Sequence, residues 1–549
     1  MPDRSRLAIL AVTTLLAAAC SSSPGTGGGS AVIGGEEQSG RAAAERLTVG
    51  VAEDAGPLNL FAGTEEALAE LVYDKLLAPN PYVDEPQPWL AERVHGIDAS
   101  TWEVTLRDDV TWHDGEALTA DDVAFTIRYF KEAPTGRWTH HVSDIPTIES
   151  VEVVDGTTVR LGCAFPCPDL GRITLADLPI IPEHVWDGVS EPSQVSALPV
   201  GTGPYRLVAY DATAGYRFEA NPGYFAGAPV VGELVMPVIE DPSATFTALR
   251  TGEIDAAARP VPPELLEAFA ASDDIEVAAT APLQFLELRL NYERPPFDVE
   301  RFRHALSLAI DRQQLLDSVL LGQGRPATEG YPHPDSPWTS PELSTPFDLG
   351  EAEAVLDDLG YVDGDGDGLR EAADGAPLAF SVKVDGGEPT HVRAAELVGE
   401  QLGAVGVGLR VEPLDAAALS NLFRSRDFDT AIGTIGAHGV ADPTQFIMSH
   451  RSGYLWKAPE LAYPEWDALF EEWRAATTVE ARTEVLFEMQ ELFNRQPTSI
   501  PLAYPDEHWA FRPGAFDGWV ESPSYGIVHK WSFLPHDVGH AANAITREF

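Results

Sequence analysis

One stretch, residues 102–130, has the clearest local pattern in the chain and limits what the chain around it can form. It reads WEVTLRDDVTWHDGEALTADDVAFTIRYF. Apolar and polar side chains alternate at its start, with the period of a half-buried strand. The turn pair Asp114-Gly115 follows, and Thr119 is then placed to cap a helix whose first turn carries Asp121 and Asp122. The pattern predicts strand, turn, short strand, turn and helix, an element of mixed α and β structure.

The N-terminus predicts export rather than a folded element. Two arginines precede the apolar run Leu7–Ala19, which is too short for a stable membrane span. Cys20 follows three alanines, and this order resembles a bacterial lipobox, in which the signal is cleaved before a cysteine that receives a lipid. We expect residues 1–19 to be a lipoprotein signal peptide, Cys20 to carry diacylglycerol and palmitate, and the Gly/Ser-rich residues 20–45 to be a tether. An ordinary secreted protein with a chance cysteine is the alternative.

Size and charge exclude several classes of protein. The chain after the tether has about 500 residues, too many for one hydrophobic core, so at least two domains are expected. The formal net charge is −50, from 36 Lys and Arg against 86 Asp and Glu. Nucleic-acid binding is excluded because its proteins carry basic faces. The scattered carboxylates predict a strongly hydrated surface suited to salty surroundings, and a cationic ligand or receptor is the alternative.

The run CAFPC holds Cys163 and Cys167, the two cysteines that remain after Cys20. In an exported chain this close pair predicts a disulfide that closes a very short loop. A metal-binding pair is the alternative, although no further cysteines accompany it.

Four motifs along the chain match the sequence motifs of one protein family. They are LRDDVTWHDG at 106–115, VGTGPYRL at 200–207, ATFTALRTGEID at 244–255 and RFRHALSLAIDRQQL at 301–315. Together and in this order they resemble the family 5 solute-binding proteins of ABC importers, the extracytoplasmic receptors for peptides, nickel and some sugars. The resemblance implies an α/β fold, a two-lobed clamshell like that of periplasmic binding proteins, with an extra subdomain in the first lobe.

The same resemblance implies domain boundaries and two chain crossings between the lobes. The expected ranges are 46–285 with 501–549 for the first lobe, 86–195 for its extra subdomain, and 286–500 for the second lobe. The crossings are expected near Leu286–Tyr292 and Ser499–Tyr504. Because such crossings are few and extended, the lobes are expected to close around a hinge as rigid bodies.

The resemblance also indicates where a ligand would lie. In peptide-binding relatives an aspartate three residues before an acidic-Pro pair holds the ammonium of the peptide, but here the pair is Asp442-Pro443 and the earlier position is Gly439. A buried ammonium without a carboxylate is costly, so Asp442, Glu53 or Asp54 would have to substitute, or the ligand is not a free-amine peptide. The candidate ligand contacts are Glu53, Asp54, Trp138, Thr434, Gly436, His438, Gly439, Asp442 and Trp456.

A second candidate site is an acidic loop. Asp363, Asp365 and Asp367, with Glu371 and Asp374 beyond them, are spaced as in a calcium loop. Glycine is at the sixth position, and Asp374 stands where the twelfth is usually glutamate; the expected ligands are Asp363, Asp365, Asp367 and Asp374. Calcium would be structural here, and no cofactor is required. An Asp/Gly turn without an ion is the alternative.

The motifs of common enzymes are missing from the sequence, which contains no HExxH, no paired CxxC and no GxSxG. We therefore predict a binding protein rather than an enzyme. It is expected to be a lipid-anchored monomer on the extracytoplasmic face of a bacterial membrane, on its periplasmic or cell-wall side. It would bind an oligopeptide or dipeptide and deliver it to the permease subunits of an ABC importer. Alternatives are a nickel chelate, an oligosaccharide or another small solute as ligand, and a sensory lipoprotein that does not transport.

Overall fold

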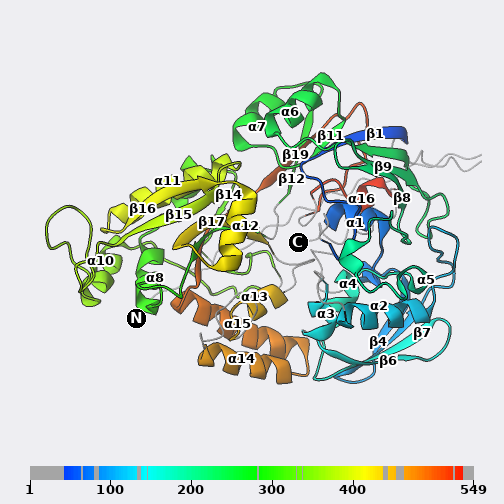
Figure 1. The fold of residues 1–549 in the computed structure, drawn as a ribbon, viewed down its shortest axis with the longest axis horizontal. Coiled ribbons are helices and arrows are strands. Elements are labelled where there is room, and N and C mark those ends of the chain that lie inside the picture. Colours follow the sequence, from blue (N-terminus) through cyan, green and yellow to red (C-terminus); the bar gives the residue numbers. More distant parts are fainter. Residues whose placement is uncertain are drawn as a thin grey trace, which may run out of the picture. The chain divides into compact units, whose positions relative to one another are not determined.

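The computed structural model describes most of the chain after the tether. The described residues are 43–62, 66–78, 86–132, 138–144, 146–280, 284–328, 330–336, 338–436, 443–452, 463–522 and 526–535. Among them, strands form sheets of seven, six, four and two strands, with helices packed on them (Figure 1). We call the part with the seven-, four- and two-stranded sheets the first lobe, and the part with the six-stranded sheet the second lobe.

The seven-stranded sheet of the first lobe combines segments from both halves of the chain. In sheet order its strands are β12 (Glu276–Thr280), β19 (Glu507–Phe511), β11 (Ala256–Ala258), β1 (Ala44–Val51), β10 (Val231–Met236), β9 (Gly215–Ala220) and β8 (Tyr205–Asp211). The central strand β1 runs parallel to both of its neighbours, β10 and β11. The helices outside the extra subdomain are α1 (Glu66–Val72), α6 (Pro242–Thr251), α7 (Pro263–Ala270) and α16 (Lys530–Phe533).

The extra subdomain of the first lobe contains the stretch at 102–130. Its four-stranded antiparallel sheet has the order β4 (Ala91–Gly96), β5 (Thr101–Leu106), β7 (Thr158–Cys163) and β6 (Ile148–Val153). The helices are α2 (Ala120–Glu132), α3 (His140–Ser143), α4 (Thr174–Asp177) and α5 (Glu183–Trp186), with a 3₁₀ turn at Pro192–Gln194; β2 (Leu77–Ala78) and β3 (Gln87–Pro88) form the small sheet. The predicted strand and helix are thus β5 and α2, while the predicted short strand is a single bridge between Thr111 and Ala117.

Thr119 directly precedes α2, where the sequence predicted its cap. The carboxylate of Asp122 accepts hydrogen bonds from both the backbone N–H and the hydroxyl of Thr119, at 2.9 and 3.1 Å. The helix therefore uses the reverse bond of a capping box, in which a carboxylate of the first turn reaches back to the residue before the helix. The other oxygen of Asp122 accepts the N–H of Glu183 and so joins α2 to α5.

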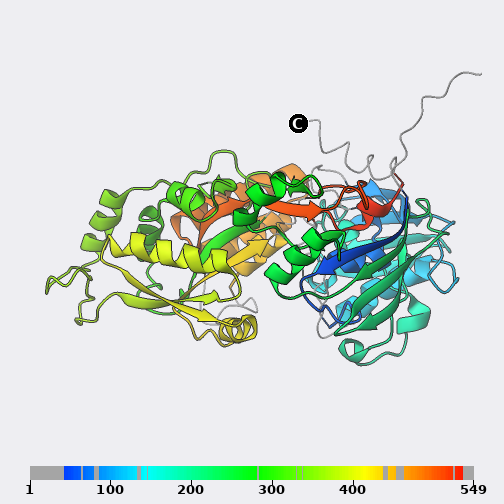
Figure 2. The same ribbon diagram turned by 90° about the horizontal axis from the view of Figure 1, so that it is seen from above.

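The second lobe is continuous in sequence. Its six-stranded sheet has the order β14 (Gly324–Pro326), β18 (Ser499–Pro505), β13 (Gln284–Leu290), β17 (Thr430–Gly436), β15 (Ala379–Asp385) and β16 (Gly408–Leu414). Its helices are α8 (Glu300–Leu308), α9 (Arg312–Ser318), α10 (Leu349–Asp358), α11 (Pro389–Gly403), α12 (Ala416–Ser425), α13 (Thr444–Ser449), α14 (Pro464–Ala475) and α15 (Val479–Arg495). The long helix α11 packs along β15, β16 and β17 (Figure 2).

The passages between the lobes lie closer to the first lobe than the sequence suggested. β13 and β18 are hydrogen-bonded neighbours in the six-stranded sheet. Residues Pro501–Pro505 therefore belong to the second lobe, because β18 continues to pair with β13 and β14 up to its last residue. The chain passes between the sheets after β12 and again between β18 and β19. There the carboxyl of Glu507 accepts a hydrogen bond from the side chain of Gln284, and burial raises the pKa of Glu507 to about 7.

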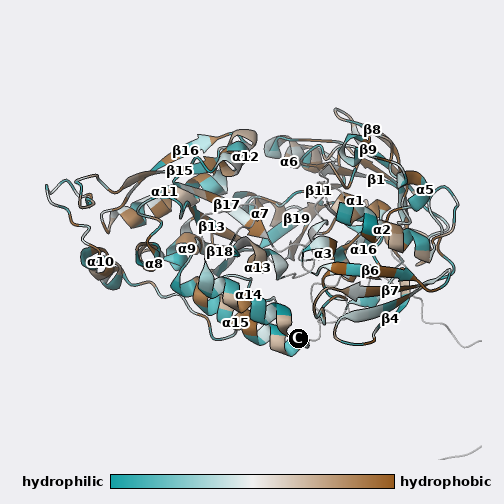
Figure 3. Cartoon of the chain, turned by 60° about the horizontal axis from the view of Figure 1, so that its bottom comes forward, coloured by the Kyte–Doolittle hydropathy of each residue, from teal (hydrophilic) through white to brown (hydrophobic). Residues whose placement is uncertain are grey.

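Burial follows the amphipathic pattern of the elements. Hydrophilic and hydrophobic residues alternate along helices and strands in both lobes (Figure 3). Large apolar clusters fill the first lobe around β1, α1 and α2 and the second lobe around β13, α8 and α11. Among the described residues, every helix is too short or too polar to cross a bilayer. The predicted disulfide between Cys163 and Cys167 is confirmed, at the end of β7.

Candidate functional site

Both lobes contain parallel strands, and charged residues follow the carboxyl ends of these strands. In the first lobe β1 is parallel to β10 and β11, and in the second lobe β15 is parallel to β16 and β17. Ligands of open α/β sheets bind outside the carboxyl ends of the strands, because loops there leave a crevice. The residues after β1, β11 and β15 are therefore the candidate site.

A group of three charged residues comes from both lobes. Glu53 follows β1 and Arg259 follows β11 in the first lobe, while Glu388 follows β15 and precedes α11 in the second. Removal from water lowers the pKa of Arg259, and the charges of Glu388, Asp241 and Glu53 counteract this shift. Removal from water raises the pKa of Glu388, against the attraction of Arg259. The lobes thus bring an arginine and carboxylates into electrostatic contact at the ends of their sheets.

A hydrogen bond of the guanidinium and an exposed ion pair lie beside this group. Arg259 donates a hydrogen bond from Nη1 to the backbone oxygen of Glu240, at 2.9 Å. On the adjoining helices, Arg393 of α11 and Glu264 of α7 form an exposed ion pair of 3.0 Å between the lobes. The two helices therefore place Glu388, at the start of α11, opposite the first lobe.

A histidine in the first turn of α11 extends the site in the second lobe. His391 Nε2 lies 3.1 Å from the hydroxyl of Thr434 on β17. Removal from water lowers the pKa of His391, so its imidazole is neutral at pH 7. Its Nδ1 has no hydrogen-bond partner among the residues that the structure describes. Beside it, Arg289 of β13 donates to Glu287 at 2.5 Å and to the backbone oxygen of Thr434 at 3.4 Å.

The carboxylate of Asp54 is used within the first lobe. It accepts hydrogen bonds from the hydroxyls of Tyr210, at 2.8 Å, and Tyr216, at 3.1 Å, and from the backbone N–H of Gly56, at 2.9 Å. These bonds hold the turn after β1 against β8 and β9. Of the predicted pair, Glu53 rather than Asp54 has its charge directed to the group with Arg259.

The other predicted ligand contacts have different surroundings. Thr434 and Gly436 lie at the carboxyl end of β17, and Thr434 is exposed. Trp138 is 2% exposed and packs in the core of the first lobe, 6.4 Å from Phe130 between ring centroids, which is a core position rather than a ligand-facing one. The remaining predicted contacts and the cysteine predicted to carry lipid lie outside the described residues. They are His438, Gly439, Asp442, Trp456 and Cys20.

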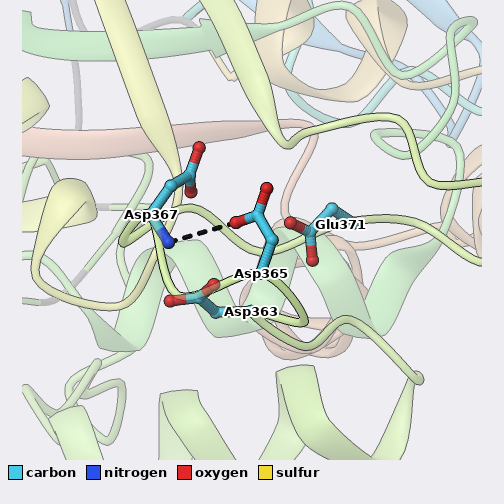
Figure 4. A group of neighbouring side chains, drawn as sticks. All are labelled: Asp363, Asp365, Asp367 and Glu371. Atoms are coloured by element: carbon cyan, nitrogen blue, oxygen red, sulfur yellow. Dashed lines mark hydrogen bonds between the residues drawn. The ribbon is translucent and has the colours of Figure 1, made fainter.

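The acidic loop between α10 and β15 brings four carboxylates together, and Asp374 of the expected ligand set is not among them. Oxygens of Asp363, Asp365, Asp367 and Glu371 lie within 4.8 Å of one another (Figure 4). Asp374 is not in this group, because it accepts the N–H of Ala376 in the next turn. Several carboxylate oxygens already accept loop N–H groups, such as Asp363 from Gly366 at 2.7 Å.

The calcium site therefore stays a prediction, with Glu371 retained beside the three aspartates and Asp374 left out. Hard oxygen ligands from one loop suit Ca²⁺, and bound ions stabilise a folded protein by mass action. We expect added Ca²⁺ to raise the melting temperature and the double substitution Asp363→Asn, Asp365→Asn to abolish that rise. A melting temperature that is the same in Ca²⁺ and in excess chelator would remove the prediction.

Sequence reasoning missed Arg259, Glu388 and His391. Arg259 directly follows the short run of alanines that forms β11, and Glu388 precedes Pro389, the first residue of α11. The sequence could have indicated these residues only by their positions, since charged residues at the carboxyl ends of parallel strands are candidates for ligand binding. This positional signal could be used only once the strands were known to be parallel and to belong to two sheets.

Comparison with known proteins gives a consistent result. The sequence profile described as "Bacterial extracellular solute-binding proteins, family 5 Middle" matches residues 85–456. Protein XP55 of Streptomyces lividans is 30% identical over 75% of this chain and 74% of its own length. The oligopeptide-binding protein AppA of Bacillus subtilis is 25% identical over 80% of this chain and 82% of its own length.

Solved structures share the fold. AppA from Bacillus subtilis in complex with a nonapeptide superposes with a TM-score of 0.76 at 21% identity, over 88% of this chain and 98% of that chain. NikZ from Campylobacter jejuni in complex with Ni(L-His) gives a TM-score of 0.77 at 23% identity, over 88% of this chain and 97% of that chain. At these identities the likeness establishes the two-lobed fold, whereas the two bound ligands belong to those proteins.

Proposed function

Because the chain belongs to family 5 of the bacterial extracellular solute-binding proteins, we propose that it binds a short peptide between its lobes and delivers it to an ABC permease. Peptide relatives support this ligand class: besides AppA, the di/tripeptide-binding protein 4 of Pseudomonas aeruginosa is 27% identical over 84% of this chain. Binding would favour the closed arrangement of the lobes, which the membrane partner then recognises.

One observation carries the proposal, the charged group formed by Glu53, Arg259 and Glu388. A free peptide is a zwitterion, with an ammonium at one end and a carboxylate at the other. Glu53 and Glu388 supply carboxylates from opposite lobes, and Arg259 supplies a cation whose charge interacts with both. Opposite charges across a binding interface contribute most to specificity. Glu53 and Glu388 thus take the role of the ammonium anchor that Gly439 does not supply.

Calorimetric titration with tri-alanine and N-acetyl-tri-alanine tests the ammonium anchor. We expect the wild type to bind the free amine about ten-fold more tightly, a difference of about 1.4 kcal/mol, because acetylation removes the charge that the carboxylates attract. Glu388→Gln and Glu53→Gln are each expected to reduce this preference. Glu353→Gln, an exposed carboxylate on α10, is the matched control. An unchanged preference in both site variants would exclude these residues as the anchor.

Native mass spectrometry of the protein as purified separates the peptide from the other ligand classes. A series of masses that fragment as peptides supports the proposal. A nickel adduct would favour a metal chelate instead, and the neutral imidazole of His391 beside the site is the metal ligand to substitute first. Masses of a hexose series would favour an oligosaccharide.

We also propose that the protein is held on the extracytoplasmic face of the membrane by lipid on Cys20. The support is the sequence before it, an apolar run of signal-peptide length, and the Gly/Ser-rich residues after it. Metabolic labelling with an alkyne fatty acid is expected to mark the wild type. The label is expected to disappear in Cys20→Ser while Cys163 and Cys167 remain. Label that persists in Cys20→Ser would contradict the anchor.

A further inference from the structure

The lobes also contact each other at a second place, between the extra subdomain and a helix pair of the second lobe. On one side is the loop Cys163–Arg172, which we call the latch loop, and on the other are α14 and α15. Arg482 of α15 donates from Nη1 to Asp169 Oδ1 at 2.5 Å and from Nη2 to the backbone oxygen of Pro166. The side chains of Arg482 and Asp169 are 0% and 1% exposed. A buried ion pair therefore joins the two lobes here.

Further contacts surround the buried pair. The guanidinium of Arg474 on α14 lies 5.5 Å from the ring centre of Phe165, and that of Arg172 lies 5.9 Å from the ring centre of Trp338. At the edge, Arg451 and Asp144 form an ion pair of 3.5 Å. Cations stacked on aromatic rings and ion pairs at the rim exclude water from the centre of such a contact. The contact thus has a buried centre and a polar rim, as small protein–protein interfaces do.

The latch loop is rigid on its own side. The disulfide joins its first residue, Cys163, to Cys167. The N–H groups of these two cysteines donate to the backbone oxygens of Ser100 and Ala99, both at 2.8 Å. The indole of Trp102 donates to the backbone oxygen of Cys167 at 3.1 Å. Contacts within the subdomain therefore fix the conformation of the latch loop before it meets the second lobe. Contact between the lobes then costs little conformational entropy, because few further residues must become ordered.

The ion pair between Arg482 and Asp169 allows the lobes to open as well as to close. Among the described residues, Asp169 Oδ2 and Arg482 Nε have no hydrogen-bond partner in this arrangement. Buried charges with unsatisfied atoms lose much of their attraction to desolvation, and separation returns both charges to water. A buried ion pair also accepts few alternative geometries, so it specifies one relative position of the lobes more than it adds strength.

We propose that the latch loop and the α14–α15 pair form a reversible latch that holds the lobes together in one arrangement, at a place separate from the candidate ligand site. The latch goes beyond the proposed function, since it depends on lobe closure and not on which solute is bound. Removing one charge leaves the other buried without a partner while the lobes are closed. Opening relieves that cost, so the single substitutions shift the equilibrium toward open molecules.

Distances between spin labels test the latch. The labels are attached through non-cysteine ketone side chains at Val154 of the subdomain and Phe347 of the second lobe, both exposed. They are read in the protein as purified and after its ligand is stripped. Asp169→Asn and Arg482→Met are each expected to raise the ratio of open to closed molecules at least about ten-fold in one of the two states. The double substitution Asp169→Leu, Arg482→Met replaces the pair by apolar side chains and is expected to reverse the shift.

Controls separate the latch from a general loss of stability. Glu264→Gln removes the exposed ion pair with Arg393, whose side chains are 48% and 38% exposed, and is expected to leave the distances unchanged. Phe165→Ser changes a half-buried residue of the latch loop without burying a charge, and is expected to open the lobes less than the charge variants. Unchanged distances in Asp169→Asn, Arg482→Met and Phe165→Ser would overturn the proposal. Because the labels report lobe separation directly, a failure of peptide binding does not affect this result.

Discussion

Replacing Lys530 by methionine is expected to lower the free energy of unfolding of the first lobe by about 3–5 kcal/mol, since it leaves a buried carboxylate without its cation. Lys530 and Asp74 are both 0% exposed, and Nζ lies 3.0 Å from Asp74 Oδ1. Asp74 also accepts bonds from Trp89, Tyr224 and Thr202, at 2.9 to 3.0 Å. These neutral donors reduce the cost of removing the Lys530 ammonium, but they supply no positive charge to the Asp74 carboxylate.

Urea unfolding at pH 7, followed by tryptophan fluorescence, measures this effect. The matched control is Arg301→Met, which breaks the ion pair with Asp358, where the side chains are 56% and 72% exposed. Such an exposed pair contributes roughly 0–1 kcal/mol. If Lys530→Met cost no more than this control, the carboxylate of Asp74 would have to be neutral or hydrated in the folded protein.

Replacing Gly201 by alanine is expected to cost about 3 kcal/mol or more, because the added methyl has no space. A Cβ at Gly201 would lie 1.9 Å from the backbone oxygen of Val72, at the end of α1. The segment cannot move away easily, since the backbone oxygen of Gly201 accepts the N–H of His113 and the N–H of Gly203 donates to Val72, both at 2.8 Å. The steric clash can be relieved only if backbone atoms move, because the atom nearest to the added Cβ belongs to the backbone of Val72.

Thermal unfolding compares this variant with Gly156→Ala, where a Cβ would meet nothing within 4 Å. The control is expected to melt within a few degrees of the wild type. The Gly201 variant is expected to melt lower by ten degrees or so, by about 2–4 °C per kcal/mol for a lobe of this size. Equal melting temperatures would mean that the loop and α1 are less closely packed than the structure describes.

The local elements of the fold were predictable where the side-chain pattern was strong. The alternation at Trp102 gave β5, the apolar spacing after Ala120 gave α2, and the two glycines around Thr202 indicated the tight passage that α1 enforces. The two-lobed arrangement came from resemblance to a family and not from periodicity. The position of Thr119 before α2 was predicted, but the direction of its bond with Asp122 was not, because a threonine followed three residues later by an aspartate is compatible with both directions of the capping bond.

The candidate site was less predictable, because its residues are distant in the sequence. Glu53, Arg259 and Glu388 follow three strands, β1, β11 and β15, that belong to two different sheets, and their charges interact only in the folded chain. Asp54 was equivalent to Glu53 in the sequence, and two tyrosines of β8 and β9 determine that it is used within the lobe. Asp374 had the spacing of a calcium ligand, but spacing does not specify the turn that directs its carboxylate to Ala376.

The origin of the two lobes along the chain has a consequence for the order in which they form during synthesis. The six-stranded sheet is made from one continuous segment, whereas the seven-stranded sheet needs β19, and Asp74 needs a lysine 456 residues further on. Domains fold as units while the chain emerges from the ribosome, N-terminal segments first. The second lobe therefore has all its strands before the first lobe has its last one. The lobe that the ribosome begins first is the one that it completes last.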